Sequence, residues 1–205
     1  MAVAVDARAA GRLLGHLFGP LSASALQQKR SFLDSKQGQP VGSPLLDVRD
    51  DPLLPRGLGS RLFDGEGIAA HPFPVFEGGV LRSYYVDTYY GRKLGMRPTT
   101  ARVSNLSWRL GDRGLGALLE QMGEGLLVVG FLGGNSNGTT GDFSLGVQGF
   151  RVRQGEVAEP QAEMNISGNH LHLWRQLSAV GNDPYRFSPL RTPTLVFEGV
   201  QVAGR

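Results

Sequence analysis

Apolar residues near the start of the chain recur at helical spacing. Asp6 is a good N-cap, and the apolar residues after it, Ala10, Leu13, Leu14 and Leu17, follow the i, i+3, i+4, i+7 pattern of a helix with one buried face. Gly-Pro at positions 19–20 ends this helix. A second helix is predicted to begin at Ser22 or Ser24 and to run through Leu26 toward Phe32.

Farther along the chain, strand-like patterns dominate. Glycine and proline punctuate residues 38–98 every few positions, which is typical of short strands joined by loops. The pattern predicts strands at residues 80–90, around Trp108, at 126–132, 142–153 and 194–202, and helices at 115–122 and 169–180. This order predicts an α+β fold with a mainly antiparallel β-sheet core and a few helices, and we expect residues 1–205 to form a single domain.

Composition narrows the classes of function. The 205 residues carry a net charge of only +3, spread without a concentrated basic stripe, so a nucleic-acid surface is not expected. There is no cysteine, which excludes disulfides, thiolate metal sites and a cysteine nucleophile within this chain. The longest apolar run, residues 126–132, is too short to cross a bilayer and no leader pattern opens the chain. We therefore expect a cytoplasmic protein without membrane contact.

The glycine-rich stretch "GGNSNGTTGDF" at residues 133–143 superficially resembles a phosphate-binding loop. Such a loop needs a lysine and a following helix, but Thr139 occupies the lysine position. Phe143, Leu145 and Val147 then alternate with small or polar residues, which indicates a strand. A nucleotide site is therefore not predicted here.

The four histidines suggest no complete catalytic site. His170 lies on the apolar face of its predicted helix and is expected to be a core or helix-start residue, and His172 lies about 160° from it around an ideal helix. His71 has no obvious partner, and His16 lies one turn after Arg12 on the face opposite Leu13 and Leu17. No metal-binding H-E-x-x-H spacing and no G-x-S-x-G motif occurs. The pair Asp50 and Asp51 is more simply interpreted as part of a turn before a proline.

Several long motifs nevertheless resemble one family in the same order along the chain. The chain is similar to the C-terminal half of the TldD/PmbA (TldE) family, formerly described as modulators of DNA gyrase. The motifs are "LLGHLFGPLSASALQQKRSFL", "DDPLLPRGLGSRLFDGEG", "GGVLRSYYVDTYYGRKLG", "GGNSNGTTGDF", "FRVRQGEVAEP", "ISGN", "AVGNDP" and "RTPTLVFEGVQVAG". Members of the family are about twice as long, and their N-terminal half has no counterpart here.

The resemblance implies a zinc metalloprotease made of paired TldD-like and PmbA/TldE-like subunits that act on small or unfolded peptides. In the TldD-like subunit, an H-E-x-x-x-H helix and a later cysteine hold zinc, and the glutamate is the general base. Here His16 matches the last histidine, whereas Gly11 and Arg12 stand in place of the first histidine and the glutamate. The segment that would carry the cysteine reads only "PYRFSPLRTP". One histidine cannot hold zinc usefully, and the positive charge of Arg12 repels a dication.

We therefore expect a non-catalytic subunit of the PmbA/TldE type, without a cofactor of its own. Its expected partners are a zinc-bearing TldD-like subunit, further copies of itself, or both, and the peptides that the complex degrades. The resemblance places the loop residues at the groove between subunits, where backbone groups could accept a peptide by strand addition; these are Gly133, Gly134, Asn135, Ser136 and Asn137. A simple tight turn is an equally good interpretation of these residues.

Two alternatives remain open at this point. The chain could itself be a hydrolase with an unrecognised site, for example His71 with Asp64 or Glu66. It could also be a gyrase-associated or nucleic-acid-binding modulator that uses the basic segment between Arg92 and Arg102.

Overall fold

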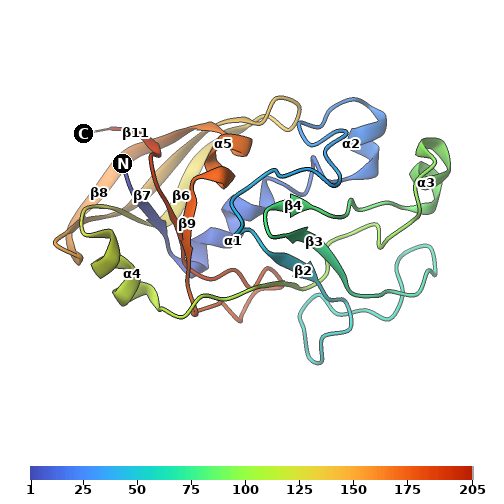
Figure 1. Ribbon diagram of the computed structural model, residues 1–205, viewed down its shortest axis with the longest axis horizontal. Coiled ribbons are helices and arrows are strands. Elements are labelled where there is room, and N and C mark those ends of the chain that lie inside the picture. The colour runs from blue at the N-terminus through green and yellow to red at the C-terminus, as the bar shows by residue number, and fades with distance from the viewer. Residues whose placement is uncertain (205) are drawn as a thin grey trace.

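The computed structural model describes residues 1–204, which form two β-sheets and five α-helices (Figure 1). The elements are β1 (Val3–Val5), α1 (Ala7–Gly15), α2 (Ala23–Gln27), β2 (Val48–Asp50), β3 (Phe73–Glu77), β4 (Val80–Leu81), α3 (Thr88–Leu94), β5 (Leu106–Trp108), α4 (Leu115–Met122), β6 (Gly125–Ser136), β7 (Asp142–Arg153), β8 (Glu156–Asn169), α5 (His170–Arg175), β9 (Leu177–Val180), β10 (Leu195–Phe197) and β11 (Gln201–Ala203).

The larger sheet has seven strands in the order β11-β8-β7-β6-β1-β10-β9, and the smaller sheet has four in the order β4-β3-β2-β5. The long hairpin strands β6, β7 and β8 form most of the larger sheet. Among the strands that the structure describes, only β1 and β6 pair in parallel, and the other strand pairs are antiparallel. The predicted α+β fold with a mainly antiparallel sheet core is thus confirmed.

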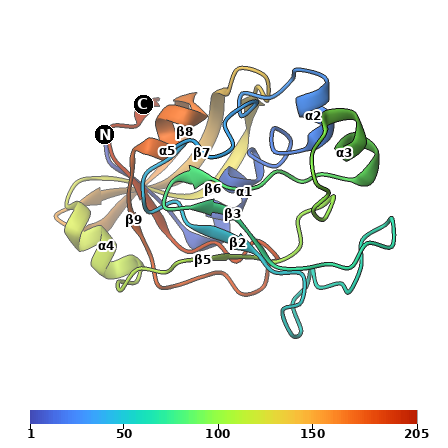
Figure 2. The same ribbon diagram turned by 45° about the vertical axis from the view of Figure 1, so that its right-hand side comes forward.

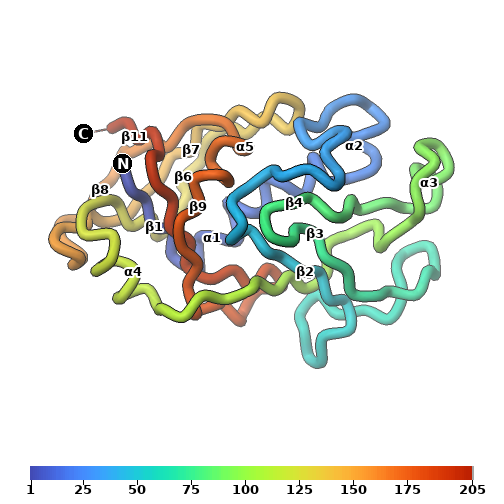
Figure 3. Tube along the Cα trace, viewed as in Figure 1, coloured from blue at the N-terminus to red at the C-terminus, as the bar shows by residue number. Residues whose placement is uncertain are grey.

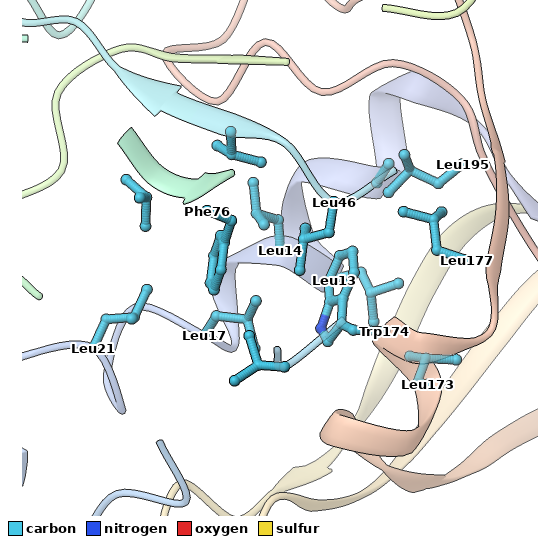
Figure 4. Packing of buried hydrophobic residues seen from close by; sticks show 14 of the residues in the cluster. Leu13, Leu14, Leu17, Leu21, Leu46, Phe76, Leu173, Trp174, Leu177 and Leu195 are labelled. Carbon is cyan, nitrogen blue, oxygen red and sulfur yellow. The ribbon is translucent and has the colours of Figure 1, made fainter. Parts of the chain in front are cut away.

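Helix α1 lies between the two sheets and organises the core. Its N-cap is Asp6, whose side chain accepts a hydrogen bond from the backbone N–H of Arg8, as the sequence predicts. Leu13 and Leu14 are buried, and in Figure 4 they lie among side chains from the smaller sheet and from α5. One cluster of buried residues draws on both sheets, so α1 is held on opposite sides by apolar packing.

The start of the chain and the last strand, β11, lie close together at one end of the larger sheet, as the tube in Figure 3 shows. The amino group of Met1 donates a hydrogen bond to the carbonyl of Val200 at 2.8 Å. Figure 2 shows α2 and α3 together at the opposite end of the molecule, beyond the smaller sheet. Within residues 1–204, every helix is too short or too polar to cross a lipid bilayer.

The prediction of one continuous strand at residues 80–90 is wrong. Only β4 is a strand, and α3 begins at Thr88, because the side chain of Asp87 caps the helix by accepting a hydrogen bond from the N–H of Tyr90. Of the tyrosines that suggested a strand, Tyr84 and Tyr85 are buried for another reason, whereas Tyr89 is 56% exposed. The hydroxyl of Tyr84 donates to the carbonyl of Leu33, so this side chain anchors a loop.

The bounds of several other helices and strands differ from the predicted ones. The helix predicted at residues 169–180 ends at Arg175, and residues 177–180 form β9 because β10 is available to pair with them. The closing strand predicted at 194–202 is divided into β10 and β11, with Gly199 between them at a φ of 67°. The second helix ends at Gln27 instead of extending toward Phe32. The strand predicted at 126–132 extends to Ser136. The predicted strands at 142–153 and around Trp108 are confirmed, and so is the predicted helix at 115–122.

Candidate functional site

The exposed side of α1 carries Gly11 and Arg12, and it faces the loop of residues 184–192. A Cβ placed on Gly11 would lie 3.5 Å from the Cβ of Leu190 and 3.7 Å from the Oγ1 of Thr192. The loop that the family resemblance associates with a cysteine ligand therefore does lie against the helix associated with the histidine ligands. In the sequence these segments are linked only through the resemblance, since about 170 residues separate them.

Arg12 directs its guanidinium toward the larger sheet. Its Nη1 donates a hydrogen bond to the carbonyl oxygen of Phe131 in β6 at 2.7 Å. Strand β1 pairs with β6 only up to Val128, so the later part of β6 has β7 on one edge and no strand of residues 1–204 on the other. Arg12 therefore binds β6 just beyond the point where its second strand partner ends.

An open cleft lies between α1 and this loop. Its volume is about 360 Å³, and it is lined by Ala7, Arg8, Gly11, Arg12, Gly15, Phe18, Tyr185, Ser188 and Leu190. The lining combines two arginines and two hydroxyls with apolar walls, and it contains no acidic side chain. We call it the α1 cleft.

His16 follows α1 and faces the interior rather than the α1 cleft. Its imidazole ring lies 5.7 Å from that of His170, centroid to centroid. Its buried Nε2 has no hydrogen-bond partner among the described residues. Burial lowers the pKa of His16, and the positive charge of Arg12 lowers it further. Both effects favour the neutral imidazole over the imidazolium.

His170 is fully buried and connects this interior pair to the glycine-rich hairpin. Its Nε2 lies 2.9 Å from the Oγ of Ser136, and its ring stacks on Phe32 and packs against Phe143 at centroid distances of 5.7 and 4.8 Å. Burial, together with the neighbouring His16, lowers the pKa of His170 from its ordinary value of 6.5 to about 4. The prediction that His170 is a core residue at a helix start is confirmed.

The stretch that begins at Gly133 is the end of a hairpin. The residues Gly133, Gly134, Asn135 and Ser136 are the last four of β6, and only Asn137 starts the turn into β7. The side-chain oxygen of Asn137 accepts the backbone N–H of Thr139 at 2.9 Å, which closes the turn locally. The sequence pattern misses the strand because glycine and asparagine are rare in strands; the pairing of Gly133 to Ser136 with β7 outweighs their low propensity.

The residues at the positions that the resemblance matches to a zinc site do not fit a catalytic zinc ion. Of the three positions where the family resemblance places zinc ligands, only that of His16 carries an imidazole. Arg12 adds a positive charge, and the facing loop places Leu190 and Thr192 against the helix. The hydroxyl of Thr192 already donates to the carbonyl of Leu190. Across residues 1–204, the structure brings together no three His, Cys, Asp or Glu side chains in an arrangement that could hold a metal.

The alternative site built on His71 is not assembled either. The carboxylate of Asp64 accepts the backbone N–H groups of Glu66 and Ile68, at 2.9 and 3.0 Å. Glu66 is engaged with the backbone and hydroxyl of Thr88. His71 lies in another cleft, of about 530 Å³, whose lining contains neither acid.

Comparison with known proteins explains the shared motifs. The family model described as "PmbA/TldA metallopeptidase C-terminal domain" matches residues 1–204. The metalloprotease PmbA of Escherichia coli O157:H7 is 32% identical over 195 residues, which are 94% of this chain and 43% of that protein. The PmbA homologue of Haemophilus influenzae is 34% identical with the same coverage. The chain thus spans less than half the length of the curated relatives it matches.

Solved structures agree with the fold. A candidate modulator of DNA gyrase from Bacteroides thetaiotaomicron superposes with a TM-score of 0.97 at 44% identity, covering 100% of this chain and 47% of that one. TldE from Thermococcus kodakarensis superposes with a TM-score of 0.90 at 24% identity, covering 99% and 50%, and shows the same fold. The chain belongs to the PmbA/TldD family of metallopeptidase-related proteins and corresponds to the C-terminal domain of that family.

Proposed function

We propose that this chain is a non-catalytic subunit of the TldE/PmbA type in a heteromeric TldD/TldE zinc metalloprotease. Its role in such a complex is to shape peptide access and to form part of the interface between subunits. The observation that carries the proposal is the position of Arg12. Its guanidinium occupies the helix position where the resemblance places the general base, and it is bonded to the carbonyl of Phe131 at 2.7 Å.

The charge of Arg12 makes this position unsuitable for metal catalysis. A fixed cation on the helix disfavours a dication nearby. The pKa of His16 is lowered by burial first, and the charge of Arg12 lowers it further. Gly11 offers no donor atom, and a side chain added there would meet Leu190. The chemistry of a complex would therefore depend on zinc held by the TldD-type partner.

The β6 edge supports a role in peptide access. From Gly130 to Ser136 this strand pairs with β7 alone among the strands of residues 1–204. Apart from the carbonyl of Phe131, which accepts the hydrogen bond from Arg12, its other edge offers backbone groups to an extended chain. Asn135 is exposed near the end of that edge. We propose that Gly133, Gly134, Asn135, Ser136 and Asn137 line the path by which a peptide enters the complex.

The test is reconstitution with a zinc-loaded TldD-type subunit. We expect a stable complex by size-exclusion chromatography with light scattering, and peptide hydrolysis well above that of either subunit alone. Replacing the glutamate in the partner's H-E-x-x-x-H motif should abolish this hydrolysis without preventing assembly. Absence of a complex, or metal-dependent hydrolysis by this chain alone, would refute the proposal.

A variant pair tests the peptide path within the reconstituted complex. Asn135→Trp places a large side chain at the exposed end of β6 and should slow peptide hydrolysis while the complex still forms. Arg153→Trp, at the opposite end of the hairpin in β7, is the matched control and should leave hydrolysis unchanged. Equal rates for the two variants would contradict the assignment of the path.

A further inference from the structure

The α1 cleft has the composition of a small ligand site. Its volume of about 360 Å³ lies within the range of sites for small ligands, on the order of 300–1,000 Å³. Arginine and hydroxyl groups line the cleft, and Phe18 and Leu190 give it apolar walls. Such a combination suits a ligand with a polar end and an apolar body.

The two arginines of the α1 cleft indicate the charge that a ligand should carry. Arg8 is neutralised locally, because its Nε and Nη2 donate to the two carboxylate oxygens of Asp6 at 2.9 and 3.2 Å. Arg12 uses only Nη1, for the carbonyl of Phe131, and no acidic side chain of residues 1–204 pairs with it. The cleft therefore presents one uncompensated positive charge, which matches a monoanion.

The remaining donors favour a planar carboxylate. Because Nη1 is engaged, the Nε and Nη2 edge of Arg12 remains for a bidentate contact, which is the geometry in which arginine binds carboxylates. Ser188 accepts the N–H of Leu190 at 3.1 Å, so its own hydroxyl proton is available to a ligand. Tyr185 adds a second hydroxyl to the lining.

The backbone leaves room for such a ligand. A Cβ added to Gly15 would have no atom within 4 Å, so the helix surface beside Arg12 is open. Phe187 is 82% exposed in the facing loop and packs edge-on against Tyr185, with ring centroids 5.7 Å apart. An exposed aromatic beside the cleft offers contact area to an apolar side chain.

We propose that the α1 cleft binds the C-terminal carboxylate of a peptide, with Arg12 as the carboxylate receptor. The helix position that carries a base in a catalytic subunit would here hold one end of a peptide. The inference rests on the proposed function insofar as the ligand is a peptide that the complex handles. Binding of the carboxylate is nevertheless a property of this chain alone and can be measured without a partner.

The experiment titrates the isolated chain with N-acetyl-Ala-Ala-Leu and with its C-terminal amide, followed by the NMR amide signals of Gly11, Gly15 and Ser188. We expect the acid to bind at least about ten-fold more tightly than the amide, because only the acid forms a charge-assisted pair with Arg12. Arg12→Gln should remove this preference. Arg92→Gln in α3, outside the lining of the cleft, is the matched control and should retain it.

A second variant guards against an indirect effect of losing the Arg12 contact with β6. Gly15→Leu fills open space at the end of α1, so the protein should remain folded while the cleft is blocked and the acid no longer binds. Equal binding of acid and amide, no binding of either, or retention of the preference in Arg12→Gln would overturn the inference. Tighter competition by inorganic phosphate than by the acid would also overturn it, since the site would then prefer a phosphate.

The outcomes separate this inference from the proposed function. Assembly and hydrolysis with a TldD-type subunit, without carboxylate binding by the isolated chain, would leave the proposed function standing and reject the inference. Carboxylate binding without a complex would reject the proposed function and retain the cleft as a carboxylate site.

Discussion

Replacement of His170 by phenylalanine should remove a pH-dependent part of the stability of this protein. His170 is fully buried, stacked on Phe32 and packed against Phe143, so a phenyl ring suits its surroundings. The substitution removes the titrating group and leaves the hydroxyl of Ser136 without its partner. At neutral pH this lost hydrogen bond should cost about 1 kcal/mol.

The magnitude of the pH effect follows from the lowered pKa. The pKa of His170 falls from 6.5 to about 4, because burial, and then the neighbouring His16, disfavour the imidazolium. The unfolded chain therefore binds a proton below about pH 6.5, whereas the folded chain resists it until about pH 4. The stabilisation is fully present above pH 6.5 and decreases as the pH falls. At about 1.4 kcal/mol for each pKa unit, the loss between pH 7 and pH 4 is about 3 kcal/mol.

The assay is urea denaturation at pH 7, 6, 5 and 4, followed by the fluorescence of the buried Trp108 and Trp174. Protonation of carboxylates destabilises both proteins alike, so the quantity of interest is the difference between wild type and variant. We expect the wild type to lose about 3 kcal/mol more than His170→Phe over this range. His71→Phe, at an exposed histidine, is the control and should follow the wild type. Parallel pH profiles for wild type and His170→Phe would refute the reasoning.

Two further predictions concern the site residues. Gly134 has a φ of 123°, and a Cβ there would clash with the carbonyl oxygen of Ser144. Gly134→Ala should therefore lower the free energy of unfolding by about 2 kcal/mol or more. A Cβ added to Gly133 would have no atom within 4 Å, so Gly133→Ala should change the free energy of unfolding much less. Equal effects of the two substitutions in urea titrations would contradict this geometry. Arg12→Gln should raise the pKa of His16, because burial still lowers this pKa but the positive charge that lowers it further is removed. An unchanged titration of the His16 imidazole by NMR would show that the guanidinium has no influence on it.

Local signals in the sequence predict the parts of the fold that depend on local physics. Asp6 caps α1 as expected, since a capping carboxylate and an apolar face at helical spacing need no distant partner to be recognised. The alternation after Phe143 predicts β7 for the same reason. Predictions fail where a partner strand decides. Residues 177–180 continue a helical pattern on paper but pair with β10, and residues 133–136 look like a turn but pair with β7.

The candidate site was predictable only in part. Gly11, Arg12 and His16 could be singled out by resemblance, and the missing cysteine is evident in the sequence. The α1 cleft was not predictable, because its lining joins α1 to residues about 170 positions away. The link from Ser136 through His170 toward His16 was likewise hidden, since no local pattern places these three side chains together.

The sequence by itself determined which chemical groups stand at the positions that the resemblance matches to a zinc helix: glycine at 11, arginine at 12 and histidine at 16, with no thiol in the 205 residues. The tertiary structure alone decided what those groups face. It turned His16 inward against His170, bound Arg12 to the carbonyl of Phe131 and opened a cleft beside it. The physical reason is that composition and local periodicity act within a few residues, whereas packing between two sheets and one helix is set by contacts across the whole chain.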